Sequence, residues 1–142
     1  MSLSYVITPF MAWLVAGCLK FSVNSVRARK LAFGLVGYGG FPSNHSSIVS
    51  SMCALIGFRE GVNAPAFGVA LTVAFVVMLD AASLRQQVGR HATSINLLAK
   101  GSDGHRVHRE RMGHTPVEIA GGVAVGILVG AAVAFGPAWW SH

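Results

Sequence analysis

Charged side chains are scarce in this sequence of 142 residues. Only 11% of the residues are Asp, Glu, Lys or Arg, whereas roughly a quarter are charged in soluble domains. Acidic residues are the rarest: there are five, against eleven Lys and Arg, so the formal net charge is +6. Hydrophobic residues make up 53% of the chain. These values exclude an ordinary soluble domain and favour a single membrane domain over residues 1–142.

Cysteine is also scarce, with only two in the chain. Cys18 and Cys53 lie in apolar runs and show neither a CxxC pattern nor metal-ligand spacing. We therefore interpret both as small buried hydrophobic residues.

No cleavable signal peptide is evident. The first apolar run, Tyr5–Phe21, has no positive residue before it, and a signal peptide needs a basic region there. We expect this run to be retained as a helix.

What the sequence does contain is four apolar segments that alternate with polar connections. Backbone groups inside the hydrocarbon must be satisfied within the segment, so each is predicted to be a helix. Apolar residues spaced by three and four predict a further amphipathic helix over Leu84–Ala99, placed at the membrane surface. The predicted fold is all-α, a polytopic membrane bundle of about four transmembrane helices with one extra amphipathic helix. The four apolar segments are Tyr5–Phe21, Ser43–Phe58, Ala66–Leu79 and Pro116–Ala138.

The basic residues gather in two of the connecting segments. Because apolar runs flank these segments, we expect anionic lipid headgroups or a substrate phosphate as partners, and no nucleic acid. The positive-inside rule favours the cytoplasmic side for both segments, although a phosphate site would need the same cations. The first group is Lys20, Arg27, Arg29 and Lys30, and the second is Arg85, Arg90, Lys100, Arg106, Arg109 and Arg111.

The polar residues at the helix ends are predicted to converge. If successive helices alternate in direction, the first and third end on the side where the second and fourth begin. The groups brought together on that side are Lys20, Ser43–His45, Asp80, Arg85, His114 and Glu118.

The segment Gly113–Gly121 carries the strongest chemical pattern. His114 and Glu118 are four residues apart, so the carboxylate could hold one imidazole nitrogen and orient the other. An oriented histidine is what a phosphoryl acceptor requires. Thr115 and Glu118 also fit a capping box, which is a purely structural interpretation. The spacing alone leaves both interpretations open.

The segment Gly39–Ser47 carries the second pattern. A glycine-containing turn that enters a helix offers free N–H groups and the positive end of the helix dipole to an anion. Ser43 and Asn44 could bind such an anion, or could simply cap the helix. His45 could donate a proton to a leaving oxygen, or could be an interfacial residue.

Cations and one carboxylate complete the candidate site. Lys20 and Arg27 are seven residues apart and would share one face of a helix. Arginine grips phosphate oxygens in a bidentate way, and lysine supplies a point charge. Asp80 ends an apolar segment, where a lone charge is costly, so we predict that it pairs with Arg85 or another cation. Membrane anchoring is the alternative role for these cations.

These patterns resemble the type 2 phosphatidic acid phosphatase superfamily, which is related to bacterial acid phosphatases and vanadium haloperoxidases. That superfamily carries the motifs KxxxxxxRP, PSGH and SRxxxxxHxxxD. The corresponding residues here are Lys20 with Arg27, then Pro42–His45, then His114 with Glu118.

The sequence is more similar still to the divergent branch of that superfamily, whose short membrane proteins carry a PSSH-like motif, a D-A-x-x-x-R segment and GHTPxE. The last two are Asp80–Arg85 and Gly113–Glu118 here. Four positions depart from the superfamily motifs: Ala28 replaces proline, Asn44 replaces glycine, Glu118 replaces aspartate, and His108 stands where an arginine is expected.

The resemblance implies a role for each site residue. His114 would attack phosphorus and form a phosphohistidine, Glu118 would orient it, and His45 would protonate the leaving group. No metal and no cofactor is implied. The residues expected to hold phosphate oxygens are Lys20, Arg27, Ser43, Asn44 and Arg85, with Arg85 or Arg109 substituting for the displaced arginine.

The resemblance also implies a substrate and a location. We expect a lipid phosphatase that acts on a polyprenyl diphosphate, a phosphatidate or a similar phospholipid, embedded as a multi-pass protein in a bacterial inner membrane. The alternatives are a lipid-phosphate binding protein or flippase without hydrolysis, and a structural membrane subunit. Because the chain is short, a second copy could complete the site in a homo-oligomer.

Overall fold

The protein is a bundle of helices in the computed structural model, which describes residues 3–29, 40–101, 104 and 106–136. No strand occurs in these ranges, so the predicted all-α class is confirmed. The helices are α1 (Ser4–Ala28), α2 (Asn44–Arg59), α3 (Pro65–Leu79), a π-helical turn (Asp80–Leu84), α4 (Arg85–Leu98) and α5 (Pro116–Phe135).

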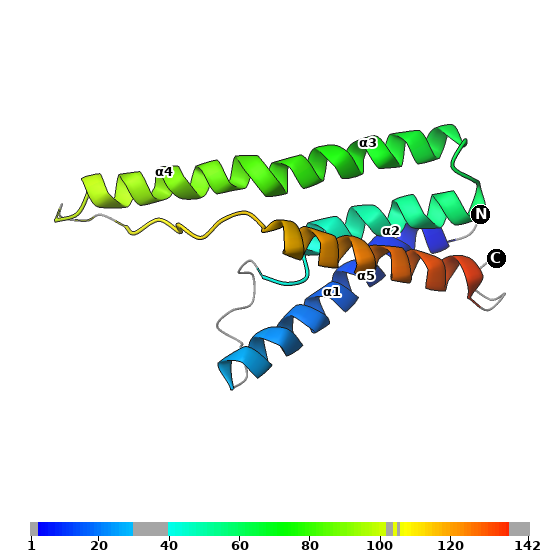
Figure 1. Ribbon diagram of the computed structural model, residues 1–142, viewed down its shortest axis with the longest axis horizontal. Coiled ribbons are helices and arrows are strands. Elements are labelled where there is room, and N and C mark those ends of the chain that lie inside the picture. The colour runs from blue at the N-terminus through cyan, green and yellow to red at the C-terminus, as the bar shows by residue number, and fades with distance from the viewer. Residues whose placement is uncertain (1–2, 30–39, 102–103, 105, 137–142) are drawn as a thin grey trace.

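Helix α2 lies at the centre, and α1, α3 and α5 each pack against it. Helices α1, α2, α3 and α5 run in alternating directions, and α1 and α3 begin at the end of the bundle where α2 and α5 end (Figure 1). The C-terminal ends of α1 and α3 and the N-terminal ends of α2 and α5 lie at the other end. The predicted convergence of the polar helix ends is therefore confirmed.

Small residues allow α5 to approach α2 closely. Gly122, Gly126 and Gly130 follow one another at intervals of four on α5. A Cβ atom on Gly126 would lie 2.6 Å from the carbonyl oxygen of Ser47, and one on Gly130 would lie 2.7 Å from that of Ser51. Small residues at such spacing let membrane helices pack backbone to backbone. The glycine face of α5 thus fixes the position of its own first turn against α2.

Three helical segments are long and apolar enough to cross a membrane, namely Ser4–Ala28, Pro65–Leu98 and Pro116–Phe135. Helix α2 has 16 residues, which is short of the roughly 20 needed to span the hydrocarbon. Its serines are buried among the surrounding helices. The protein is therefore an integral membrane protein with a short polar helix at its centre.

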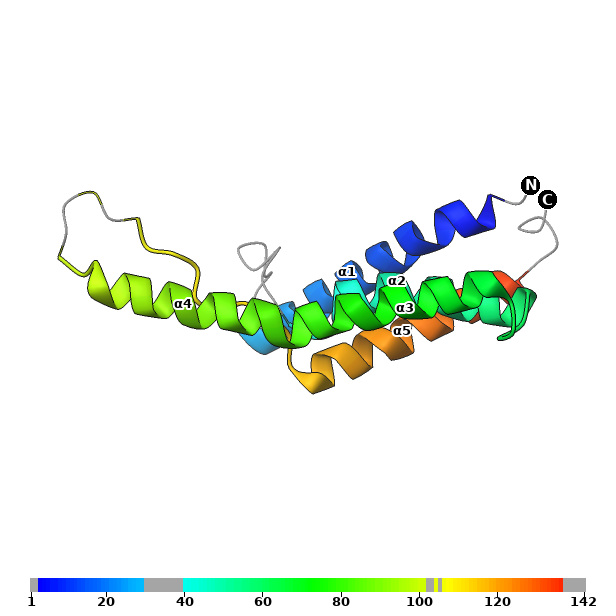
Figure 2. The ribbon, with the colours of Figure 1, turned by 90° about the horizontal axis from the view of Figure 1, so that it is seen from above.

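The predicted amphipathic helix is present as α4. Helix α4 continues α3 through the π turn, and the two form one rod of 34 residues (Figure 2). At 1.5 Å per residue this rod is about 51 Å long, whereas the hydrocarbon core is about 30 Å thick. Helix α4 therefore extends beyond the bundle as a continuation of α3. The apolar segment is predicted to end at Asp80, whereas the helical backbone continues there through a π turn over Asp80–Leu84.

The first helix is longer than the predicted segment Tyr5–Phe21. Helix α1 continues through the basic stretch to Ala28 and ends where Arg29 adopts a left-handed conformation, with φ of 49°. The predicted last apolar residue, Ala138, lies outside the described residues, as does most of the glycine-rich run 31–41.

The segment that leads back from α4 to α5 lies along α4. The side chain of Asn96 donates to the carbonyl oxygen of His108 and accepts from its amide, both at 2.8 Å. Gly89 of α4 leaves room for the Glu110 carbonyl, which would lie 2.4 Å from a Cβ atom at that position. This segment continues directly into His114.

Candidate functional site

Two histidines face each other where α2 and α5 begin. His45 lies in the first turn of α2, and His114 precedes α5 by one residue. Their ring centroids are 5.6 Å apart, and the rings meet edge to face at 74°. The structure therefore brings together the two histidines that the sequence singled out, from positions 69 residues apart in the chain.

Three polar atoms, in the first two residues of α2 and in His114, are buried and have no hydrogen-bond partner in the described structure. They are the Nδ1 atoms of His45 and His114 and Oδ1 of Asn44. The His114 side chain is among the least accessible polar groups, with a relative exposure of 7%. Buried polar atoms in native proteins are nearly always hydrogen-bonded, so a cluster of unpartnered ones indicates a place for water or a ligand.

The start of α2 is held by Ser43 and tied to α5. The Ser43 side chain caps α2 by accepting from the backbone amide of Ser46 at 3.3 Å, and it also accepts from the Ser46 hydroxyl at 3.1 Å. The Ser43 amide donates to the Glu118 carbonyl oxygen at 2.9 Å. The predicted capping role of Ser43 is therefore present, and the first-turn N–H groups of α2 point toward the histidine end of the bundle.

The backbone of His114 is held by the π turn and by α4. Its amide donates to the Ala81 carbonyl oxygen at 3.0 Å, and its carbonyl oxygen accepts from Nε2 of Gln86 at 3.1 Å. Gly113 has a φ of 86°, a left-handed conformation that suits glycine. Sequence reasoning missed Gln86, because no local pattern links it to a residue 28 positions away.

Lys20 and Arg85 are the cations at the pair. Both lie close enough to interact electrostatically with the two imidazoles. Nε of Arg85 is 2.7 Å from Oδ2 of Asp80, so the predicted pairing of these two residues is confirmed. The pair is about one-third exposed, at 39% for Arg85 and 34% for Asp80, which leaves the guanidinium accessible to an anion.

Glu118 adopts the capping arrangement. Its carboxylate accepts from the Thr115 amide at 2.9 Å, while its own amide donates to the Thr115 hydroxyl at 3.3 Å. The carboxylate is near enough to act electrostatically on His114, but Nδ1 of His114 has no partner. The capping interpretation of this motif is therefore confirmed, and no hydrogen bond from Glu118 orients the imidazole in this structure.

Burial lowers the pKa of His114 below its ordinary value, and the positive charge of Lys20 lowers it further. The negative charge of Glu118 acts in the opposite direction and is outweighed. Since an ordinary histidine has a pKa of about 6.5, the imidazole is mostly neutral at neutral pH. A neutral imidazole has a free lone pair, which a nucleophile needs.

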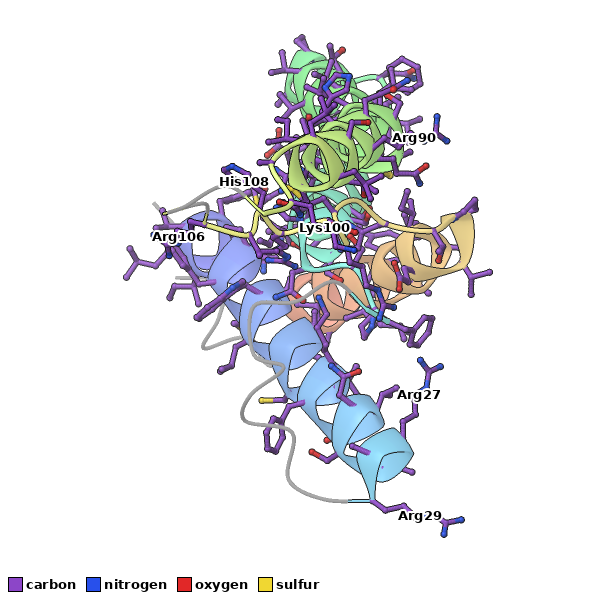
Figure 3. The ribbon with its side chains drawn as sticks, turned by 90° about the vertical axis from the view of Figure 1, so that its left-hand side faces the viewer. Arg27, Arg29, Arg90, Lys100, Arg106 and His108 are labelled. Atoms are coloured by element: carbon purple, nitrogen blue, oxygen red, sulfur yellow. The ribbon has the colours of Figure 1, made fainter. Side chains whose placement is uncertain are left out.

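Two predicted phosphate-binding residues lie elsewhere. Arg27 is exposed in the last turn of α1, and Figure 3 shows it with Arg29 at the end of that helix, its side chain directed away from it. Arg109 is on the segment beside α4, where its Nε donates to the Arg111 carbonyl oxygen at 3.2 Å. No described contact brings either arginine to the histidine pair.

Two comparisons with known proteins find relatives of this chain. The model of the Divergent PAP2 family matches residues 1–129. The uncharacterized membrane protein YuiD of Bacillus subtilis (strain 168) is 28% identical over 141 residues, covering 87% of this chain and 89% of that protein. No solved structure matches. Because the family model covers most of the chain, including both histidines, the protein belongs to the Divergent PAP2 family.

Proposed function

We propose that this protein is an integral membrane lipid phosphatase that works through a phosphohistidine on His114. The observation that carries the proposal is the pair of His45 and His114, whose buried Nδ1 atoms have no partner among the described residues and which lies near two cations. Two histidines, a helix N-terminus and Lys or Arg groups together form a set that phosphoryl transfer can use. Family membership supports a phosphatase-related role in general terms.

The proposed reaction has two steps. A neutral nitrogen of His114 attacks the phosphorus, a P–N bond forms, and the P–O bond to the lipid breaks. His45 donates its proton to the leaving oxygen, which departs as an alcohol or as a shorter phosphate. Water then attacks the phosphohistidine, His45 takes a proton from that water, and inorganic phosphate leaves while His114 is regenerated.

The surrounding residues have electrostatic tasks in this proposal. Lys20 and Arg85 counter the negative charge of the phosphoryl oxygens, and the first-turn amides of α2 donate to them. Asp80 keeps the Arg85 side chain in place through the 2.7 Å ion pair. Asn44 would donate from its side-chain N–H groups to a phosphoryl oxygen, since its buried Oδ1 can only accept.

The substrate is proposed to be a phosphate or diphosphate lipid, of the polyprenyl diphosphate or phosphatidate type. The site lies at one end of helices with exposed apolar faces, where a lipid would present its headgroup while its chains stay in the bilayer. The basic character of the segments at this end favours the cytoplasmic side of a bacterial inner membrane.

Phosphate release in detergent tests the proposal. Purified wild-type protein is expected to release phosphate from at least one member of a panel of lipid phosphates, and His114→Ala is expected to abolish the release. His91→Ala is the matched control, because His91 is exposed on α4, and it should behave as wild type. Equal rates for His114→Ala and wild type would remove His114 from the role of nucleophile.

One observation favours a second function, that of a lipid-phosphate binder or flippase without hydrolysis. The carboxylate of Glu118 is engaged with the Thr115 amide rather than with His114, so the usual orienting group is missing. A binding protein needs the cations and the helix N-terminus but not an oriented histidine. Binding of a lipid phosphate without any release of phosphate, unchanged in His114→Ala, would establish this alternative.

A further inference from the structure

As a nucleophile, the buried imidazole of His114 would have to be held in a fixed orientation. Its Nδ1 has no hydrogen-bond partner, and the carboxylate of Glu118 is held by the Thr115 amide. The ring direction therefore depends on packing against His45 and on how firmly the backbone of His114 is held. A nucleophile that is misplaced by about 1 Å can lose about a hundredfold in rate.

Two hydrogen bonds hold that backbone, and both come from the junction of α3 and α4. The His114 amide donates to Ala81 and its carbonyl oxygen accepts from Gln86, at 3.0 and 3.1 Å. Gly113 makes this approach feasible, because a Cβ atom there would lie 2.7 Å from Cγ of Gln86.

The π turn makes the Ala81 carbonyl available for this purpose. In an α-helix that carbonyl would accept from the amide of Arg85, four residues later. Here the Arg85 amide donates to Asp80 instead, so the Ala81 carbonyl loses its usual donor and accepts from His114. Single π turns occur often at functional sites, and this one leaves the Ala81 carbonyl oxygen as an acceptor for the His114 amide.

We propose that Gln86 is a positioning residue for His114, and that together with the Ala81 carbonyl it forms a backbone clamp on the nucleophile. This inference rests on the proposed phosphatase reaction for its kinetic consequence. Gln86 does not touch the substrate in this account; it acts by keeping the imidazole of His114 directed at the phosphorus. The clamp takes over the orienting task that the sequence had suggested for Glu118.

Gln86→Leu removes the donor while keeping a side chain of similar size, and Gln87→Leu is the matched control, since Gln87 is exposed. Gln86→Leu is expected to lower kcat by about 10- to 100-fold with KM changed by less than about threefold, because positioning affects the transition state more than binding. Gln87→Leu should leave both unchanged. A change in KM alone for Gln86→Leu would overturn the positioning role.

Gln86→Glu supplies a readout that a merely structural role would not give. A protonated glutamic acid can donate to the His114 carbonyl oxygen, whereas an ionised one cannot. The ratio of Gln86→Glu activity to wild-type activity is therefore expected to rise as pH falls through the carboxyl pKa. The ratio for Gln87→Glu should stay flat. Parallel profiles for the two variants would contradict the clamp.

Hydrogen exchange separates this inference from the proposed function. The amide of His114 is expected to exchange faster in Gln86→Leu than in wild type or Gln87→Leu, whether or not the protein is an enzyme. Faster exchange without any phosphate release by wild type would overturn the phosphatase proposal and leave the clamp. Equal exchange in the Gln86→Leu and Gln87→Leu variants would overturn the clamp whatever the activity.

Discussion

The two ends of the bundle use polar groups in opposite ways. At the end where α1 begins and α2 and α5 end, Arg59 of α2 donates to the Ser4 hydroxyl of α1 and, at 3.0 Å, to the Val133 carbonyl oxygen of α5. Its guanidinium also lies 5.7 Å from the ring centroid of Tyr5. One cation therefore joins three helices, and both of its terminal nitrogens donate to a partner.

At the other end, polar atoms converge without partners. The Nδ1 atoms of His45 and His114 and Oδ1 of Asn44 are buried and lack hydrogen bonds among the described residues. The part-buried Arg59 shows that this bundle provides hydrogen-bond partners for a polar group that joins its helices. Unsatisfied groups at the histidine end are therefore better explained by a ligand than by poor packing.

The largest expected change at the histidine end is the loss of reaction rate in His45→Ala. If His45 protonates the leaving oxygen, the variant should lose about 10²- to 10⁴-fold in rate on a lipid phosphate. The loss should be smaller on an aryl phosphate, whose leaving oxygen needs less protonation. Initial rates on the two substrates check this. The unfolding midpoint in detergent should not fall, because an imidazole with an unpartnered nitrogen is removed. Equal losses on both substrates would argue against an acid.

Arg59→Met should have the opposite effect: it should lower the stability and leave the reaction rate nearly unchanged. Hydrogen bonds to charged groups contribute about 1.5–3 kcal/mol each, so the free energy of unfolding should fall by about 3 kcal/mol. The rate should stay within about twofold of wild type, because the change is at the far end of the bundle. Arg111→Met, at an exposed position, is the control for loss of charge. A rate loss as large as that of His45→Ala would show that the two ends are not independent.

Gly126→Ala should lower both the stability and the reaction rate. The new Cβ would lie 2.6 Å from the Ser47 carbonyl oxygen, so α5 must move away from α2, and overpacking of this kind costs about 1–3 kcal/mol. Because α5 follows directly on His114, the rate should fall along with the unfolding midpoint. Gly68→Ala on α3 is the matched control, since no atom lies within 4 Å of its new Cβ. If both alanines are tolerated equally, the close approach of α2 and α5 does not set the site.

The smallest expected effect is on pH dependence. The acid limb of kcat/KM reports the free-enzyme nucleophile, and it should lie below the ordinary histidine value of about 6.5 because burial and Lys20 lower the pKa of His114. Lys20→Met removes a positive neighbour and should move the limb to higher pH. Glu118→Gln removes the negative charge that opposes the shift, and should move the limb to lower pH. Shifts of the same sign in both variants would contradict the assignment of the limb to His114.

Much of the fold and the central pair could be predicted from the sequence. Hydropathy gives the apolar segments, and alternation of their direction is enough to bring His45 and His114 to one end. The pairing of Asp80 with Arg85 follows from the cost of a lone carboxylate at the end of an apolar segment. These predictions depend only on composition and on order along the chain, which is why they were accessible.

Other features depend on backbone geometry that the sequence does not encode locally. The π turn has no sequence signature, so Asp80 looked like a helix end and α4 like a separate helix. The contact of Gln86 with His114 exists only once that turn is formed. Glu118 lies three residues after Thr115 and four after His114, so spacing alone cannot separate capping from orientation.

The most direct test of the account is a search for phosphate on His114. Wild-type protein would be mixed with a radiolabelled lipid phosphate, quenched without acid, and mapped by peptide mass spectrometry. The account predicts an alkali-stable, acid-labile phosphohistidine on the peptide that contains His114, absent in His114→Ala and retained in His91→Ala. Turnover of the lipid by wild type with no label on that peptide, or with the same label in His114→Ala, would contradict the central claim.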